Sequence, residues 1–371
     1  MAGEDSTAPK RKRPMGLKAR TAKKANTVTS AGAQEVADFA DSTTATVMLR
    51  GEDANEIDEL EGIFTSALEA LAEGDDERSV TLLRGTVHES DRLLRIHDTS
   101  DERLEPRFYY IYASALFRLS EHVSDADERR VFVQLALERI EQAREMAVAS
   151  EDAILWQVYM ALAKFTLEVA AEAEEEGEAV KGVDRAIEAL DNAVCALEKQ
   201  GDASLVEESL AAADLVLSLA DSQRLPEQPS ARLVAWGELT ARKLVEKQSN
   251  DEGGKCILAR ALWLRASAMI DDTDEIREKD VFASLLKEAA LLLEKVEASD
   301  GLLLLGEIEI NLGNVQDDEA EMEKWYTQAV ATFRRAQAKG ELPEQFAQFI
   351  DDFENDDDDD DDDESDDGDD E

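Results

Sequence analysis

The sequence predicts an all-α protein in which a stack of helical hairpins lies between a basic N-terminal arm and an acidic C-terminal tail. Three observations lead to this prediction. The middle of the chain is filled with the strong helix formers Ala, Leu, Glu and Arg, and only four prolines fall between residues 54 and 350. Its apolar residues recur at helical spacing, without an alternating strand pattern. The two ends carry opposite charge and no sustained apolar period, which is typical of disordered segments.

Residues 1–53 form the predicted disordered basic arm. Residues 1–24 hold eight Lys and Arg against two acidic residues, a net charge of +6, although the whole chain carries −47. A compact run of cations in an extended segment is typical of a nuclear localisation signal, because an import receptor pairs each cation with carboxylates. The predicted signal comprises Lys10, Arg11, Lys12, Arg13, Lys23 and Lys24. Two alternatives stay open: an arm that binds nucleic acid, and an arm that pairs with the chain's own acidic tail.

Residues 54–350 are predicted to form ten or eleven helices joined by short loops. The breaks fall at 124–128, 174–178, 199–202, 224–229, 249–254 and 297–301, where Gly, Pro, Asp and Ser interrupt the apolar pattern. Two clear apolar stripes are Phe108, Tyr112, Ala115 and Leu119, and then Leu155, Tyr159, Leu162, Phe165 and Val169. Ser204 and Glu207 have the spacing of a capping box at the start of a helix.

A short pattern recurs along this segment: Ala, three residues, a large apolar residue, two residues and Ala. It occurs at 136–143, 186–193 and 329–336, with a looser version at 289–296. The small residues let two antiparallel helices approach closely, and the large residue fills the gap between them. This pattern is typical of the second helix of a tetratricopeptide repeat, so we predict a tetratricopeptide-like solenoid. The alternative is an ordinary Ala-rich helix bundle.

The last unit of this segment fits the tetratricopeptide pattern best. Leu302 and Leu305–Gly306 match the start of the first helix, with Leu in the place of Trp, and residues 329–336 supply the second helix. Two features depart from the pattern. Glu309 occupies a position where the pattern has Tyr, and residues 315–325 predict an unusually long loop between the two helices.

Residues 351–371 form the predicted disordered poly-Asp tail. This stretch holds 17 Asp and Glu and no basic residue, so its charges repel one another. Residues 25–350, which lie between the basic cluster and the tail, still carry −36. An acidic body argues against direct sequence-specific nucleic-acid binding, which needs a basic patch. The acidity of the body favours basic proteins as partners. Alternatively, the charge only keeps the protein soluble.

The sequence contains no recognisable catalytic or cofactor-binding pattern. His88, His97 and His122 form no metalloprotease motif or triad, and no phosphate-binding glycine loop or nucleophile elbow occurs. Cys195 and Cys256 lie far apart and are predicted to be small core residues rather than disulfide or zinc partners. We therefore expect a protein that is not an enzyme and that needs no cofactor or metal.

Hydropathy argues against a membrane protein. The longest apolar stretch, residues 153–163, is interrupted by Gln157. It is shorter than the roughly 18 residues that a span requires. No signal-peptide core follows Met1, because the chain is charged from Lys10 onward. We expect a soluble protein in a reducing compartment.

Two tryptophans are candidate partner-binding residues. Trp156 and Trp263 lie in strongly apolar helical segments, so they are predicted to pack between helices. The alternative is that one of them anchors a partner in the concave face of the solenoid, because Trp is enriched at binding hot spots.

The motif Lys12–Arg13–Pro14–Met15–Gly16–Leu17, followed by an acidic all-helical middle and a poly-Asp end, resembles the fungal enhancer of translation termination family. Its fission-yeast relatives are described as nuclear import adaptors and negative regulators of a prolyl-hydroxylase-like dioxygenase. The resemblance implies a nuclear regulator that binds this iron- and 2-oxoglutarate-dependent dioxygenase and influences translation termination. Its implied partners are the dioxygenase, a nuclear import receptor, and translation termination or ribosome-associated factors.

Two functional hypotheses follow. The first is a nuclear adaptor whose arm is an import address and whose solenoid holds a partner. A second pool of the protein in the cytoplasm is compatible with this hypothesis. The second is an acidic chaperone that masks basic clients such as histones or ribosomal proteins.

Overall fold

The computed structural model describes residues 55–97, 104–201, 204–248, 251–270 and 276–358, which divide into two compact units. The N-terminal unit runs to Ile257 and the C-terminal unit begins at Leu258, so the boundary falls inside a helix. Within the described residues every regular element is an α-helix, apart from an isolated bridge between Ile270 and Ile276. The predicted all-α fold is confirmed. None of the described helices is long and apolar enough to cross a bilayer.

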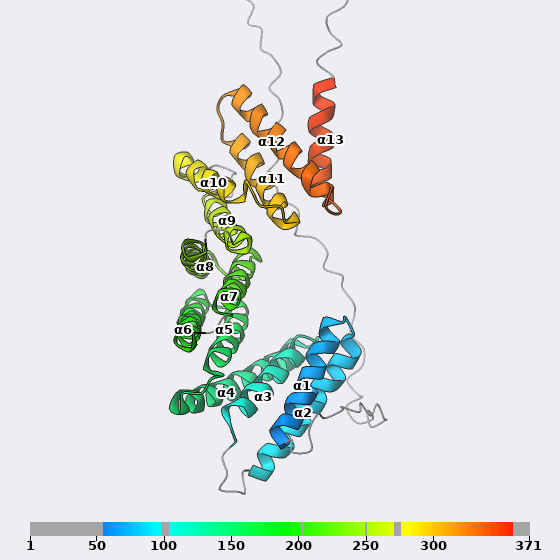
Figure 1. Cartoon of the computed structure of the whole chain (residues 1–371), viewed down its shortest axis with the longest axis vertical. Coiled ribbons are helices and arrows are strands. Elements are labelled where there is room, and N and C mark those ends of the chain that lie inside the picture. The colour runs from blue at the N-terminus through cyan, green and yellow to red at the C-terminus, as the bar shows by residue number, and fades with distance from the viewer. Residues whose placement is uncertain (1–54, 98–103, 202–203, 249–250, 271–275, 359–371) are drawn as a thin grey trace, which may run out of the picture. The chain divides into compact units, whose positions relative to one another are not determined.

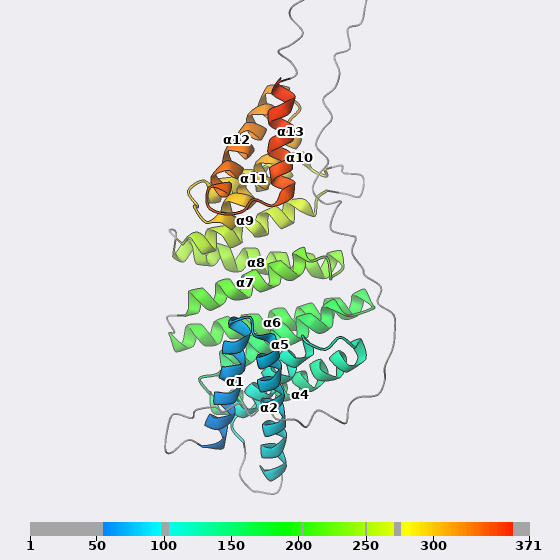
Figure 2. The ribbon, with the colours of Figure 1, turned by 90° about the vertical axis from the view of Figure 1, so that its right-hand side faces the viewer.

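The N-terminal unit is a stack of helix pairs. Its complete helices are α1 (Glu56–Ala72), α2 (Asp76–His97), α3 (Pro106–Ser120), α4 (Ala126–Ser150), α5 (Leu155–Ala171), α6 (Glu176–Gln200), α7 (Leu205–Asp221) and α8 (Glu227–Lys247). Each odd-numbered helix packs against the even-numbered helix that follows it. Within this unit α5 and α7 lie on one side and α6 and α8 on the other (Figures 1 and 2). This is the arrangement of helical hairpins that the sequence predicts.

Local sequence explains where several helices begin and end. The Asn55 side chain accepts hydrogen bonds from the backbone of Ile57 and Asp58 at 3.0 and 2.9 Å, and the Asp58 carboxylate accepts one from the Asn55 backbone at 3.2 Å. This capping box satisfies the free N–H groups at the start of α1. Pro106 begins α3, where its missing N–H costs nothing. Gly201 ends α6 with φ +62°, a conformation that favours glycine.

The recurring Ala pattern forms the core between paired helices. Ala136, Ile140 and Ala143 of α4 have no exposed surface, and neither have Ala186, Leu190 and Ala193 of α6. The small side chains face the partner helix and the branched side chain fills the space beside them. The prediction that this pattern marks helix contacts is therefore confirmed.

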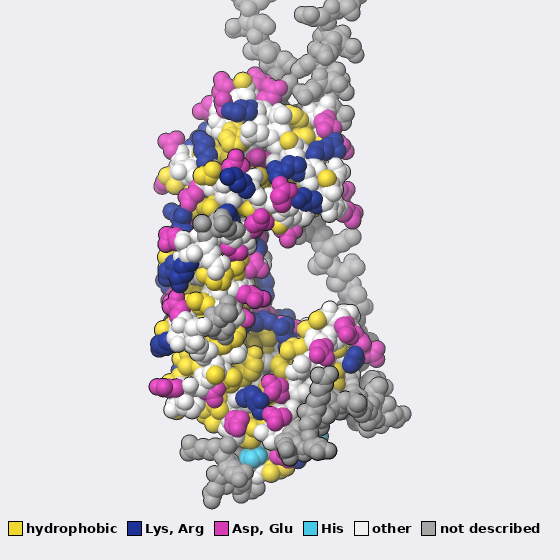
Figure 3. Space-filling model, viewed as in Figure 1, with side chains coloured by type: hydrophobic (Ala, Val, Ile, Leu, Met, Phe, Trp, Pro, Cys, Tyr) yellow, Lys and Arg dark blue, Asp and Glu magenta, His cyan; other side chains and the backbone are white. Residues whose placement is uncertain are grey.

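Polar contacts join the even-numbered helices of successive pairs. Arg185 of α6 pairs with Glu141 of α4, and Arg232 of α8 pairs with Asp184 of α6. The indole N–H of Trp236 donates to Asp191 across the same α8–α6 contact at 2.8 Å. Basic side chains are thus used to bridge helices in an acidic chain, and Figure 3 shows both signs of charge interspersed on the visible face of each unit.

The C-terminal unit contains the larger part of α9 (Glu252–Ser267), followed by α10 (Lys279–Leu293), α11 (Ser299–Asn314), α12 (Glu319–Gln337) and α13 (Glu344–Asp358). Helices α11 and α12 form its closest pair, and α13 packs on α12. Phe333 of α12 is fully buried and stacks on Phe346 of α13, with ring centroids 4.5 Å apart.

The two helices that the sequence assigns to the last unit pack closely on each other. A Cβ built on Gly306 of α11 would lie 2.4 Å from Phe333 Cε1, so only glycine lets α12 approach this closely. Leu302 and Leu305 of α11 are buried beside it. Gly306 and Phe333 therefore lie at the contact between the two helices of this tetratricopeptide-like pair.

Glu309 is buried in the same helix pair, with 8% of its surface exposed. Burial raises the pKa of its carboxyl to about 7, while a hydrogen bond from Thr332 and the charge of Arg335 lower it only in part. Its Oε2 has no hydrogen-bond partner among the described residues. A carboxyl thus occupies the position where the repeat pattern has Tyr, and the fold keeps it partly protonated near neutral pH.

Two predicted boundaries differ from the structure. Residues 315–325 are not a long loop, because α12 begins at Glu319 with the Asp318 side chain as its cap, accepting from Glu321 N at 3.0 Å. Helix α13 runs to Asp358, beyond the predicted end of the helical segment at residue 350. The described residues contain thirteen helices, more than the ten or eleven predicted.

Three smaller expectations were wrong. The Ser204 side chain makes no capping hydrogen bond to α7, because the backbone at Ser204 is already helical at ψ −5°. Val169 is 43% exposed, since the buried stripe of α5 turns away from it. Cys195 lies on the exposed side of α6 rather than in the core.

Candidate functional site

A pocket of about 460 Å³ opens in the N-terminal unit between α3, α5 and α7. These are the first helices of three successive pairs, so the pocket lies on the side of the stack opposite α6 and α8. Side chains of α4 and of the loop after α7 close its ends. Its size is in the range of ordinary ligand and peptide sites.

The floor of the pocket is apolar. Phe117 of α3 and Leu167 of α5 are buried, and Leu215 and Leu219 of α7 are half-buried along the opposite wall. Phe117 stacks on Phe165 with ring centroids 4.2 Å apart, which fixes the distance between α3 and α5. The packed rings make the floor rigid, and the half-buried Leu215 and Leu219 supply the apolar surface that a ligand can cover.

Lys164 stands over this floor. Its Nζ lies 4.9 Å from the centre of the Phe117 ring and 3.3 Å from the Glu121 carboxylate, which also pairs with Arg118 at 3.0 Å. Burial lowers the pKa of the Lys164 ammonium, as does the nearby Arg118 charge, against the opposing effect of Glu121. The Glu121 carboxylate thus pairs with two cations, so it neutralises the Lys164 charge only in part.

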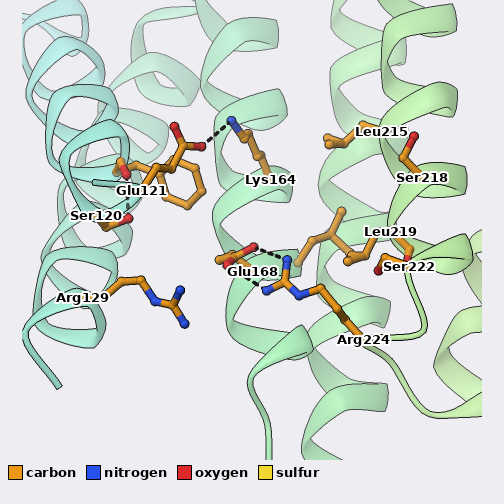
Figure 4. Close-up of a pocket in the computed structure, with 12 residues that line it drawn as sticks. Ser120, Glu121, Arg129, Lys164, Glu168, Leu215, Ser218, Leu219, Ser222 and Arg224 are labelled. Carbon is orange, nitrogen blue, oxygen red and sulfur yellow. Dashed lines mark hydrogen bonds and ion pairs between the residues drawn. The ribbon is translucent and has the colours of Figure 1, made fainter. Parts of the chain in front are cut away.

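Two arginines reach the pocket from other elements. Arg224, after α7, makes two hydrogen bonds of 2.8 and 3.1 Å to Glu168 of α5. Arg129 of α4 pairs with Glu172 at the end of α5, and its buried Nε has no hydrogen-bond partner among the described residues. In Figure 4, Lys164, Arg129 and Arg224 all extend toward the space between the helices.

The arrangement is suited to binding. It combines an apolar floor with fixed cations, and its hydroxyl groups are engaged locally: Ser120 donates to the Phe117 carbonyl at 2.6 Å and Ser222 to the Leu219 carbonyl at 2.7 Å. Over the part of the chain that the structure describes, no three His, Cys, Asp or Glu side chains are grouped as a metal site would require.

The residues predicted from sequence lie elsewhere. Trp156, in the first turn of α5, and Trp263, in α9, are both half-buried and belong to different units. Neither lines the pocket, so a partner-binding role for them stays a prediction. Lys10, Arg11, Lys12, Arg13, Lys23 and Lys24 lie outside the described residues.

Sequence reasoning missed the three cations of the pocket. Lys164 did carry a signal, because it is the single basic residue in the mostly apolar α5. Arg129 and Arg224 carried none, since each stands among other charged residues. They meet only because three helix pairs bring residues from different parts of the chain together.

Comparison with known proteins gives the chain its family. The model of the family described as nuclear pore complex subunit Nro1 matches residues 8–216, more than half of the chain. The chain belongs to the Nro1 family. The matched residues of this Nro1 family member include the basic cluster of the arm and most of the pocket, and the family resemblance drawn from residues 12–17 is confirmed.

Named relatives of this Nro1 family member are similar over a shorter stretch. Enhancer of translation termination 1 of Candida albicans is 32% identical over 155 residues, 41% of this chain and 35% of that protein. Negative regulator of ofd1 of Schizosaccharomyces pombe is 32% identical over 131 residues, 33% of this chain and 31% of that protein. The match therefore spans about a third of the length of these curated relatives.

A solved structure of the family has the same fold. The S. pombe nuclear import adaptor Nro1 superposes with a TM-score of 0.53 at 21% identity, covering 84% of this chain and 99% of that one. At this identity the likeness concerns the fold alone, and it supports the stack of helix pairs.

Proposed function

We propose that this protein is a non-enzymatic nuclear adaptor and regulator. It binds a prolyl-hydroxylase-like 2-oxoglutarate dioxygenase through its helical-repeat surface and influences translation termination. The observation that carries the proposal is the Nro1 family match over residues 8–216. The names of the relatives, an enhancer of translation termination and a negative regulator of ofd1, support the two parts of this function.

The architecture fits an adaptor. A stack of helix pairs presents a long side-chain surface on which a partner can lie without any moving part. The pocket between α3, α5 and α7 adds a rigid apolar floor with cations around it. Such a surface holds a partner protein and supplies no chemistry of its own.

The basic arm has a separate task in this proposal. A nuclear import receptor binds the arm at residues 10–13 and at Lys23 and Lys24, while the helical body holds the partner. The arm is therefore basic although the body is acidic, because different proteins bind the two parts. The protein then resides in the nucleus and carries its partner there.

The test is the location of a fluorescent fusion in cells, with the dioxygenase tagged in a second colour. Replacing residues 10–13 by Ala should move both proteins to the cytoplasm, and replacing Lys23 and Lys24 should do so in part. The matched control removes two cations, Arg78 and Arg130, that are more than half exposed on the helical body. If the 10–13 variant stays nuclear, the arm is not the import address. If the dioxygenase is unaffected by any variant, this chain does not carry it.

An acidic chaperone of basic clients is a second candidate, favoured by the net charge of −47 and the 17 carboxylates of residues 351–371. Its binding would be dominated by exposed charge and would weaken steeply as salt screens it. Removal of residues 359–371 separates the candidates. Client binding should fall strongly for a chaperone, whereas an adaptor that binds through its helical body should keep its partner.

A further inference from the structure

The pocket between α3, α5 and α7 is locally basic in a strongly acidic chain. Arg129, Lys164 and Arg224 line it with Glu121 and Glu168. The outer partners of these groups add one cation, Arg118, and one carboxylate, Glu172. The site therefore holds four cations and three carboxylates, in a protein that carries −47 overall.

Two of these cations can still bind a further negatively charged group. Lys164 shares the Glu121 carboxylate with Arg118, and its side chain is only 31% exposed, so water compensates it incompletely. Arg129 has a buried Nε–H without a hydrogen-bond acceptor among the described residues. A buried donor without an acceptor costs free energy, and an incoming carboxylate would remove that cost.

The apolar floor lies directly beside these cations. Lys164 Nζ is 4.9 Å from the Phe117 ring centre, and the Leu215 and Leu219 side chains face the same space from α7 (Figure 4). A ligand that fits both parts must present an apolar side chain with negative charge on either side. A bare anion would leave the half-buried Leu215 and Leu219 uncovered, and a purely apolar peptide would desolvate the cations without pairing them.

We infer that this pocket receives a short acidic segment of a partner protein, in which an apolar side chain is flanked by carboxylates. The inference rests on the proposed function only in taking the chain to be a protein-binding scaffold. The apolar side chain packs against the half-buried Leu215 and Leu219, beside the buried Phe117. The flanking carboxylates accept hydrogen bonds from Lys164 and Arg129, and Arg224 can exchange one of its two bonds to Glu168 for one to the ligand.

The chain's own tail is a poorer occupant. Residues 359–371 consist of Asp, Glu, Ser and Gly alone, so they offer charge but no apolar side chain for the floor. A partner segment with both features is the better match to the pocket.

The probe is a panel of fluorescein-labelled hexapeptides with two central residues drawn from Leu, Ile, Phe and Trp and four flanking Asp or Glu residues. Binding to the purified full-length chain is measured by fluorescence anisotropy. We expect several members to bind. Their Asn/Gln versions should bind at least about tenfold more weakly, because charge-assisted hydrogen bonds are lost. Versions with Gly at the two central positions should also bind about tenfold more weakly, because the apolar contact is lost.

Variants of the chain locate the binding. Lys164→Gln and Arg129→Gln should each weaken the peptides about tenfold. The matched control is Arg232→Gln, which removes the same charge from an ion pair with Asp184 between α8 and α6, away from the pocket. It should leave binding within twofold of the unmodified chain, and circular dichroism should show that all three variants keep their helices.

Three results would overturn the inference. One is that no peptide of the panel binds, and another is that Arg232→Gln weakens binding as much as Lys164→Gln does. The third is that a chain ending at Asp358 binds the peptides at least tenfold more tightly, which would make the tail the occupant. None of these readouts depends on nuclear location or on the dioxygenase, so failure here is distinguishable from failure of the proposed function.

Discussion

Glu309 offers the sharpest test of how the last helix pair is packed. Its carboxyl is 8% exposed between α11 and α12, with one oxygen unpartnered among the described residues, and burial raises its pKa to about 7 from an ordinary value of 4.5. The perturbation is Glu309→Gln, which keeps the size and removes the charge. We expect the variant to be more stable than the unmodified protein at neutral and alkaline pH.

The magnitude follows from linkage. Below pH 4.5 the carboxyl is protonated in both the folded and the unfolded chain, so it has no effect on stability. Between pH 4.5 and about 7 the unfolded chain ionises while the folded chain keeps its proton, so stability falls as pH rises. Above that range the Glu309 carboxylate is ionised in both states, and the full free-energy cost of burying its charge lowers the stability of the folded protein. The shift corresponds to about 3 kcal/mol at most, because each pKa unit is worth about 1.4 kcal/mol.

The assay is amide hydrogen exchange of α11 and α12 in urea, carried out from pH 4.5 to 8 on both proteins. The difference in unfolding free energy between Glu309→Gln and the unmodified protein should be near zero at pH 4.5 and should grow to between about 1 and 3 kcal/mol at pH 8. Glu323→Gln, which removes an exposed carboxyl of α12, is the matched control and should show little change.

Two results would refute this reasoning. A difference that does not change with pH would mean that the Glu309 pKa is the same in the folded and unfolded chains. A variant that is less stable at pH 8 would mean that the carboxylate is ionised and stabilised by its neighbours in the fold.

Three further predictions concern packing and capping. Gly306→Ala should lower the stability of the C-terminal unit by about 1–3 kcal/mol, because the new Cβ would meet Phe333 at 2.4 Å; an unchanged melting temperature would contradict this packing. Gly85→Ala, in the middle of α2 with its nearest neighbour atom at 3.9 Å, should instead stabilise the N-terminal unit by up to about 1 kcal/mol, and a loss would show hidden crowding. Asn55→Ala should cost about 1 kcal/mol and speed hydrogen exchange in the first turn of α1, whereas unchanged exchange would mean that the capping box contributes nothing.

The helix-pair architecture could be predicted because it depends on local spacing. The Ala pattern at 136–143, 186–193 and 329–336 is buried wherever it occurs, since close helix packing requires small residues at those intervals. The repeat pattern also assigns Gly306 and Phe333 to the two helices of the last pair, and the structure shows that they meet.

Boundaries and exposure were harder to predict. Residues 315–325 look like a loop because Asp and Glu dominate them, but acidic residues also favour the first turn of a helix, and α12 begins there. Cys195 was expected in the core from the usual behaviour of its residue type, yet it lies on the outer side of α6. Such features depend on how helices rotate against their neighbours, which local spacing does not determine.

The pocket could not be predicted at all. Its cations come from α4, α5 and the loop after α7, and its apolar floor comes from α3, α5 and α7. No local pattern places Arg129 and Lys164 in one pocket, because their meeting there follows from the stacking of one helix pair on the next. The net charge of the whole chain would predict an acidic surface, whereas the pocket carries more cations than carboxylates.

The central claim, that this chain is an adaptor which holds a specific partner through its helical body, is tested most directly by affinity purification. The tagged chain is recovered from its native cells, washed at low and at high salt, and its partners are identified and quantified by mass spectrometry. We expect a dioxygenase in a stoichiometric amount that survives the high-salt wash, because partly buried contacts are screened less than exposed ones. A broad set of basic proteins that is lost at high salt would contradict the adaptor function and would point to an acidic chaperone.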